Sequence, residues 1–260
     1  MRNLFLSMVL LAALPGNGFG WGREGHRLVA RIAALHLNGK AQAEAAKLLA
    51  GESLESIAAW ADEVRPQRKE TTTWHYINIP IKAERGDWRQ YCPASGCVLR
   101  SVQEMAAKLK NPALPAGERT EALKFLVHFA GDMHQPLHVS DNGDRGGNDV
   151  PIIFQNRPSN LHSVWDTPIV LQAEAQPGFE ARVTKKAGYW ERKKLQKGSV
   201  GDWAWDSVRI SRSVTYGLLP AGRPAKVEQA YVKSSVAPVE AQIRRAGLRL
   251  ALLLNQSLGR

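Results

Sequence analysis

The sequence predicts a mainly α-helical chain with little extended structure. Most of the chain after residue 20 consists of stretches in which apolar side chains recur at helical spacing. Two short stretches, 71–80 and 150–154, are rich in β-branched or aromatic residues and predict strands. No repeat, low-complexity tract or domain linker interrupts the chain, whose 260 residues suit one large domain or two small ones.

The first 20 residues differ in composition from the rest. Arg2 is their only charged side chain, residues 4–14 form an apolar run, and Gly18 and Gly20 place small residues two apart. This pattern predicts a signal peptide over residues 1–20, cleaved after Gly20, and a mature domain over 21–260 in a secreted or periplasmic protein. The apolar run is too short to span a membrane, although an uncleaved anchor is the alternative.

The first helix of the mature chain is predicted just after this segment. Apolar residues between 28 and 35 recur at helical spacing and place His26 in the first turn. If the signal peptide is removed, Trp21 carries a free α-amino group, which can chelate a metal ion together with its own carbonyl oxygen. The alternative is a packed amino-terminal tryptophan and a surface histidine.

Two further helices are predicted before Pro66. The second covers 41–50, and the third starts near Ser53 and ends at Arg65. Asp62 falls on the apolar side of this third helix, where a carboxylate is costly unless it is paired or binds a metal ion. An ordinary intrahelical ion pair between Asp62 and Arg65 is the alternative explanation.

Residues 71–80 are expected to be extended. A period of two places His75 on the apolar side and Tyr76 with Asn78 on the opposite side. His75 is therefore either an ordinary core histidine or a metal ligand.

The only two cysteines of the chain follow this segment. Cys92 and Cys97 flank the turn-forming sequence Pro-Ala-Ser-Gly, and an oxidising compartment would join them as a local disulfide. A zinc site would need further sulfur ligands, which the sequence lacks. A helix is predicted directly afterwards, over 98–109.

The central stretch of the chain runs from His128 to His138 and ends a helix with apolar periodicity. His128 and Asp132 are four residues apart and therefore share a helix face. Pro136 cannot continue the helix, so the chain should turn and bring His138 back towards them. Two imidazoles and a carboxylate at one helix end suit zinc, although each residue alone also has a structural explanation.

A later stretch repeats this arrangement. Asn160 is expected to cap a helix in which His162 and Asp166 are again four residues apart. Between the two stretches lie a polar loop, whose acidic spacing does not match a helix-loop-helix calcium site, and a strand followed by a turn through 155–160. The remainder, to residue 258, predicts mostly helices that pack the core.

The net charge narrows the class of partner. With 35 Lys and Arg against 24 Asp and Glu, the formal charge is +11. A surplus of this size in a secreted protein indicates polyanionic partners such as nucleic acid, or a soluble basic protein that has no such partner.

The candidate metal ligands share nitrogen or carboxylate donors without sulfur, which favours zinc. Five of the seven histidines belong to this set, and nine donors are too many for one tetrahedral ion. The set comprises Trp21, His26, Asp62, His75, His128, Asp132, His138, His162 and Asp166.

The sequence resembles the secreted zinc-dependent nucleases typified by nucleases S-one and P-one, over nearly all of residues 21–260. The fold that this resemblance implies is a single helical domain of the zinc-dependent phospholipase C and nuclease P-one type, with a short β-hairpin and three zinc ions at the base of a cleft. The resemblance rests on six motifs in order, Trp21-Gly-x3-His26, Trp60-Ala-Asp-Glu-x-Arg65, Trp74-His-Tyr76, Phe125-Leu-Val-His-Phe-x-Gly-Asp-Met-x-Gln-Pro-Leu-His138, Gly146-Gly-Asn148 and Leu161-His-Ser-x-Trp-Asp166.

The resemblance also assigns ligands to each ion. The first zinc would be held by Asp62, His75, His128 and Asp132. The second would be held by His138, His162 and Asp166. The third would be chelated by the amino nitrogen and carbonyl oxygen of Trp21, with His26 and Asp132, so that Asp132 bridges two ions.

Further residues are expected to act on the substrate. The resemblance implies catalytic roles for Asp62, Arg65 and Asp132. Arg65 would also bind phosphate, Tyr76 would stack on a base where fungal members have Phe, and Asn148 would contact the nucleotide. Asn78 stands where fungal members carry Asp, which puts its role near the attacking water in doubt.

The implied function is a monomeric, secreted endonuclease without stable membrane insertion. It would hydrolyse single-stranded DNA and RNA to 5′-phosphorylated products, bind nucleotides and carry 3′-nucleotidase activity. One alternative is a zinc-dependent phospholipase C, which resembles this family in fold and metal cluster but usually has Glu at the position of Asp166. A second is a non-catalytic basic zinc-binding protein, which would need neither Arg65 nor an open cleft.

Overall fold

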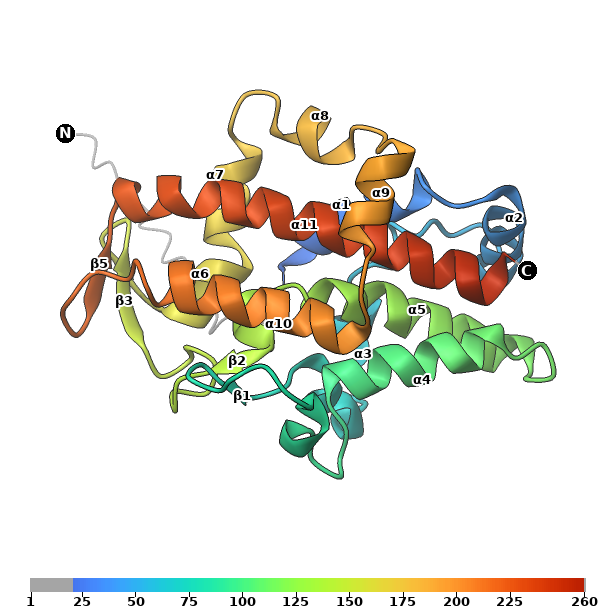
Figure 1. Ribbon diagram of the computed structural model, residues 1–260, viewed down its shortest axis with the longest axis horizontal. Helices are drawn as coiled ribbons and strands as arrows, with labels where there is room; N and C mark the ends of the chain where they lie inside the picture. Colours follow the sequence, from blue (N-terminus) through green and yellow to red (C-terminus); the bar gives the residue numbers. More distant parts are fainter. Residues whose placement is uncertain (1–20, 260) are drawn as a thin grey trace, which may run out of the picture.

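The computed structural model describes residues 21–259 and is mainly helical, as expected (Figure 1). The predicted signal peptide lies outside the described residues. The longer helices are α1 (Arg23–Ala34), α2 (Gly39–Leu49), α4 (Val98–Lys110), α5 (Ala116–Asp132), α10 (Val200–Ile210) and α11 (Gln229–Leu258). The shorter helices are α3 (Trp60–Val64), η1 (Lys69–His75), η2 (Trp88–Tyr91), η3 (Pro136–His138), α6 (Leu161–Asp166), α7 (Pro168–Glu174), α8 (Phe179–Thr184), α9 (Tyr189–Leu195) and η4 (Ser211–Thr215).

The core forms around two of these helices. The long α11 runs along the molecule and contacts α1, α7, α4 and α5, while α5 also packs against α4 (Figure 1). Each contributes an apolar face: Leu28, Val29 and Ile32 of α1 are all at most 1% exposed. This burial supplies the main stabilising free energy and fixes α5, whose carboxyl end carries the central motif.

Polar side chains from α11 hold the chain just after α5. Gln242 donates a hydrogen bond from Nε2 to the carbonyl oxygen of His134 (2.8 Å). Arg249, which is buried and paired with Asp206 (2.7 Å), donates to Nε2 of His134 (3.0 Å). Because buried polar groups are costly to separate from their partners, these bonds fix the turn that follows Asp132.

Two small sheets complete the fold. Strand β1 (Ile79–Pro80) pairs in parallel with β2 (Ser140–Asp141). Strands β3 (Pro151–Phe154) and β4 (Arg157–Asn160) form the expected hairpin, and β5 (Ala225–Val227) adds in parallel to β3. The turn that was expected to run through 155–160 is only two residues long, because Gln155 and Asn156 both adopt positive φ angles (50° and 61°), as in a type I′ turn.

Two further sequence-based expectations about local structure are wrong. The third helix does not span Ser53 to Arg65: only Trp60–Val64 is α-helical, and the residues before it form turns. Residues 71–75 belong to η1 rather than to a strand, because the hydroxyl groups of Thr71 and Thr72 donate to backbone carbonyls three residues earlier (2.7 Å each) and stabilise the tight turns.

The remaining expectations about local structure agree with the molecule. The disulfide between Cys92 and Cys97 is formed, and α4 begins directly after it. Asn160 caps α6 by accepting a hydrogen bond from the backbone N–H of Ser163 (2.8 Å). Between residues 21 and 259 no helix is long and apolar enough to cross a membrane.

Candidate metal centre and cleft

The nine candidate ligands come together from six helices and the segment that precedes the first of them. Trp21 precedes α1, His26 lies in α1, Asp62 in α3 and His75 at the end of η1; α5 supplies His128 and Asp132, η3 supplies His138, and α6 supplies His162 and Asp166. All nine residues are at most 7% exposed. A buried cluster of ionisable groups is costly unless its members satisfy one another or hold a cation.

Asp132 occupies the centre of this cluster. Its Oδ2 lies 3.0 Å from Nδ1 of His75 and 3.2 Å from Nε2 of His128. Its Oδ1 lies 3.4 Å from Nε2 of His26 and 3.4 Å from Nδ1 of His138. One carboxylate therefore faces four imidazole rings that come from four different elements.

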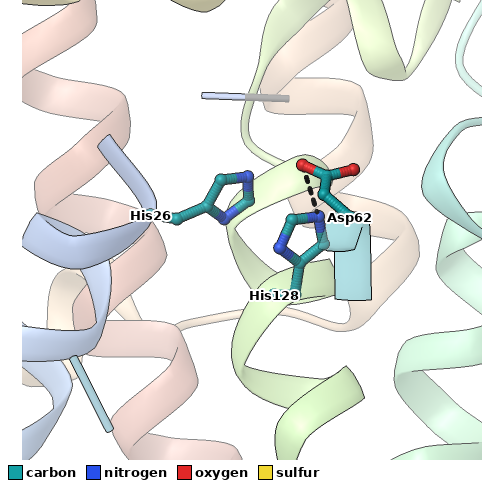
Figure 2. Close-up of side chains that lie close together, drawn as sticks. All are labelled: His26, Asp62 and His128. Atoms are coloured by element: carbon teal, nitrogen blue, oxygen red, sulfur yellow. Dashed lines mark ion pairs between the residues drawn. The ribbon is translucent and has the colours of Figure 1, made fainter. Parts of the chain in front are cut away.

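A second carboxylate, Asp62 of α3, approaches two of these rings, and Figure 2 shows its ion pair with His128. Asp62 lies 3.5 Å from Nε2 of His128 and 3.6 Å from Nδ1 of His75. The ring of His26 stacks on that of His128 with centroids 3.9 Å apart. The expected ion pair between Asp62 and Arg65 exists at 3.5 Å, but the two imidazoles show that the pair alone does not account for the burial of Asp62.

The remaining ligand candidates form a neighbouring group. Nε2 of His162 lies 3.3 Å from Oδ2 of Asp166, and Nε2 of His138 lies 3.8 Å from Oδ1. Gln135, which sequence reasoning missed, donates from Nε2 to Oδ1 of Asp166 (2.5 Å) while its Oε1 accepts from the backbone N–H of Leu137 (2.5 Å). Gln135 therefore fixes the orientation of this carboxylate.

Backbone carbonyls orient three of the rings. Nδ1 of His128, His138 and His162 lies 2.8, 2.8 and 2.7 Å from the carbonyl oxygens of Ala58, His75 and Gly146 respectively. A carbonyl oxygen only accepts, so each Nδ1 carries a proton, and in the neutral ring Nε2 keeps a lone pair for a metal ion.

The carbonyl that orients His162 depends on a glycine. Gly146 has φ 60°, and a Cβ atom there would lie 2.6 Å from the carbonyl oxygen of Leu137. The Gly146-Gly-Asn148 motif is therefore needed for the backbone path that brings this carbonyl to the ring.

Many polar atoms of the cluster have no hydrogen-bond partner. Each buried donor or acceptor left unsatisfied costs roughly 1–3 kcal/mol, so the cluster is costly unless a cation satisfies these atoms. Their ligand atoms lie within 4.8 Å of one another in three groups, each able to hold a metal ion. Within the described chain the unpartnered imidazole and carboxylate atoms of the cluster are both ring nitrogens of His26, Nε2 of His75, His128 and His138, and one oxygen each of Asp62, Asp132 and Asp166.

The pKa shifts within the cluster show how a bound cation would change its protonation. Burial lowers the pKa of His128, but Asp132 and Asp62 outweigh it and raise this pKa to about 9, so a metal ion would have to displace a second proton from Nε2 of this ring. Burial lowers the pKa of His138 to about 3. Burial also raises the pKa of Asp166 well above its usual range. A cation bound between His138 and Asp166 would lower the pKa of Asp166 again and keep its carboxylate ionised.

A cleft of about 890 Å³ opens onto the cluster. Asp62, His75, His138 and His162 line its base, whereas the other five ligand candidates are not among its lining residues. The expected substrate residues Arg65, Tyr76, Asn78 and Asn148 all line the cleft, together with the cations Lys69 and Arg145, which sequence reasoning missed.

The strand pairing explains why Tyr76 reaches the cleft. The N–H of Ile77 donates to the carbonyl of His138 (2.8 Å), so residues 76–80 lie beside the second ligand group. The alternation expected from period two holds here: His75 and Ile77 are buried, while Tyr76 and Asn78 are exposed. Tyr76 is 37% exposed and can offer a ring face to a ligand.

Gly131 leaves room for the ring of His26, and this close approach leads to a prediction. A Cβ atom at Gly131 would lie 2.6 Å from Nδ1 of His26, so Gly131→Ala must displace this ring. We expect metal affinity or activity to fall about 10-fold or more, the range for residues that position metal ligands. Elemental analysis after equilibration with zinc would measure the loss.

Gly117→Ala is the matched control for this substitution, because Gly117 lies in the same helix with open space around it. Both substitutions favour helix formation, by about 1 kcal/mol per residue, so neither should unfold α5. Unchanged metal content in Gly131→Ala would contradict the assigned position of His26.

Comparison with known proteins agrees with this geometry. Residues 21–259 match the S1/P1 Nuclease family. The chain is 30% identical to Endonuclease 2 of Arabidopsis thaliana over 284 residues, which cover 98% of this chain and 96% of that protein. It is 29% identical to Nuclease P1 of Penicillium citrinum over 271 residues, covering 92% and 98%. The expected resemblance is confirmed: the chain belongs to the S1/P1 nuclease family and is a nuclease that acts on nucleic acids.

Proposed function

We propose that this nuclease is a secreted, trinuclear-zinc endonuclease of single-stranded DNA and RNA. Its products would carry 5′-phosphates, and it would also act as a 3′-nucleotidase. The observation that carries this proposal is the set of unpartnered imidazole and carboxylate atoms at the base of a cleft that also presents Tyr76 and Arg65.

The donor set supports zinc and the ligand assignment. It contains nitrogen and oxygen donors and no sulfur, which suits zinc. The group of His138, His162 and Asp166 is the one proposed for the second ion, and His75, His128 and Asp132 form three of the four ligands proposed for the first. The distance of 3.4 Å between Asp132 and His26 supports Asp132 as the carboxylate shared with the third ion.

Different groups in the cleft would serve different steps of phosphodiester hydrolysis. Bound zinc would lower the pKa of a water molecule from about 16 towards 7 and so supply the nucleophile. Arg65, held by Asp62 at the base of the cleft, would donate to the phosphoryl oxygens as they gain charge. Asn148 is held by a hydrogen bond from Nδ2 to the carbonyl of Arg145 (2.8 Å) and would contact the nucleotide.

Substrate preference would come from the aromatic side chain. Stacking on Tyr76 tolerates any base but requires an unpaired strand, which favours single-stranded DNA and RNA. The cations Lys69 and Arg145 along the cleft would attract the phosphate backbone. Asn78 lines the same cleft without a negative charge and would leave this attraction undiminished.

The direct test uses protein that begins at Trp21. We expect it to cleave single-stranded DNA and RNA faster than duplex, to release 5′-phosphorylated products, and to lose activity with a chelator and regain it with zinc. Phosphatidylcholine in the same assay series separates the phospholipase alternative: hydrolysis of the lipid without cleavage of either nucleic acid would overturn the proposal.

Tyr76 allows a sharper prediction about recognition. Tyr76→Ala should raise the KM for single-stranded substrates about 10-fold, because base stacking is worth roughly 1–3 kcal/mol. Tyr76→Phe keeps the ring and should retain the KM of the original protein. Zinc content should be the same in both variants, and a KM that stays constant in Tyr76→Ala would assign the ring to packing instead.

The third ion leads to a prediction about the amino terminus. Trp21 is fully buried, and its carbonyl oxygen accepts a hydrogen bond from the backbone N–H of His26 (3.2 Å). We propose that the amino nitrogen and this carbonyl complete the third site only after residues 1–20 are removed, because an amide nitrogen is a poor zinc ligand. Signal cleavage would then switch the enzyme on.

Zinc content measures this directly. Protein that retains a methionine ahead of Trp21 should bind about two zinc ions instead of three and have weak activity, since the third site lacks its chelate. The same polypeptide, after proteolytic removal of the extra residue, is the control and should regain both. Three bound ions and full activity in verified extended protein would contradict the switch.

A further inference from the structure

Helix α9 presents aromatic side chains to solvent, outside the cleft. Tyr189 is 60% exposed and Trp190 is 75% exposed, although aromatic side chains of this size are usually largely buried. Their rings lie edge to face with centroids 5.0 Å apart. Among the described residues, those that line the cleft include none from α9. The two rings therefore form a surface that the proposed catalytic site does not explain.

One lysine lies close to both rings, and the segment that carries them is rich in other cations. Nζ of Lys193 lies 5.9 Å from the ring centre of Tyr189 and 5.5 Å from that of Trp190. Glu191, the single carboxylate between 185 and 197, is paired with Arg244 of α11 (2.7 Å). The cations of this segment are Lys185, Lys186, Arg192, Lys193, Lys194 and Lys197.

The fold holds this surface in place. Arg244 also donates to the carbonyl oxygens of Val183 and Lys185 (2.8 and 2.9 Å), which ties the preceding loop to α11. Arg249 donates to the carbonyl oxygen of Leu195 at the end of α9 (2.9 Å). Figure 1 shows α9 lying against α11, and the contacts between the two helices agree. The helix that carries the aromatic pair is therefore held in a fixed position against α11.

We propose that the α9 surface, defined as residues 185–197, is a second binding site for single-stranded nucleic acid. Exposed aromatic rings among cations are the combination that binds unpaired strands, because rings stack on bases while the cations meet phosphates. The surface would hold a distant part of a long strand whose scissile bond lies in the cleft. The proposal rests on the nuclease activity of the family and is independent of the zinc assignment.

Substrate length separates this site from the cleft. The variant Tyr189→Ala/Trp190→Ala should raise the KM about 10-fold for long oligothymidylates, since each stacked base is worth roughly 1–3 kcal/mol. The KM for a dinucleotide, which fills only the cleft, should change less than twofold. Substrates of 2, 8, 15 and 30 nucleotides would show the length at which the effect begins.

Controls match each substitution elsewhere on the surface. Leu171→Ala/Leu218→Ala removes two apolar side chains that are 44% and 47% exposed, and should leave every KM unchanged. Lys193→Gln/Lys194→Gln should flatten the dependence of KM on salt for long strands only. Lys47→Gln/Lys233→Gln removes the same charge from exposed positions of α2 and α11 and should leave the salt dependence of KM unchanged.

Photocrosslinking gives a readout that does not require cleavage. A 30-nucleotide bromodeoxyuridine oligomer should crosslink to the peptide that contains Tyr189 and Trp190, as identified by mass spectrometry. This crosslink would be detected even if the enzyme did not cleave single strands. The α9 site and the proposed endonuclease activity can therefore be tested separately.

Three results would overturn the α9 site. The first is the same KM for long strands in the aromatic variant, with no crosslink to α9. The second is an equal loss for the dinucleotide, which would indicate a structural effect. The third is loss of binding to anionic phosphatidylserine vesicles, with oligonucleotide kinetics unchanged, which would make α9 a membrane-surface contact.

Discussion

Asp132 places a fully buried carboxylate within 3.4 Å of ring nitrogens from four histidines. Burial alone would favour the neutral acid, but His128 and His138 outweigh it and hold the pKa of Asp132 well below its usual range. The ionised carboxylate is therefore the common neighbour of rings from α1, η1, α5 and η3. Any displacement of these elements would separate a buried charge from its partners, which costs several kcal/mol.

The rest of the molecule keeps this arrangement fixed. Backbone carbonyls set the rings of His128, His138 and His162, and Gln135 sets the carboxylate of Asp166. Behind them, α11 fixes the end of α5 through hydrogen bonds to His134. The candidate metal centre thus sits on packed helices, which hold side chains in more precise positions than mobile loops can.

The sequence could predict those parts of the site that depend on local spacing. The i, i+4 relation of His128 and Asp132 follows from helix geometry, and the structure places both on one face of α5. His75 required a resemblance, because its neighbours in the cluster are distant in sequence and the local strand prediction was wrong. The carbonyl of Ala58, which orients His128, could not be predicted because a backbone group leaves no trace in the identity of its side chain. Gln135 could not be predicted because no periodic or chemical pattern distinguishes it from a surface residue.

Binding of metal and stability of the fold are linked through the unpartnered atoms. Each buried imidazole nitrogen or carboxylate oxygen without a partner costs roughly 1–3 kcal/mol, and the cluster contains several. The fold tolerates them because the core, packed around α11 and α5, is large. On the proposed assignment, zinc would satisfy these atoms only in the folded chain, and its binding free energy would then add to the stability of the fold. The unpartnered atoms that would make the cluster costly without a metal ion would thus be the ones that give the metal its affinity. This linkage does not extend to α9, where Tyr189, Trp190, Lys193 and Lys194 are exposed to solvent, so the cluster and the α9 surface can change independently.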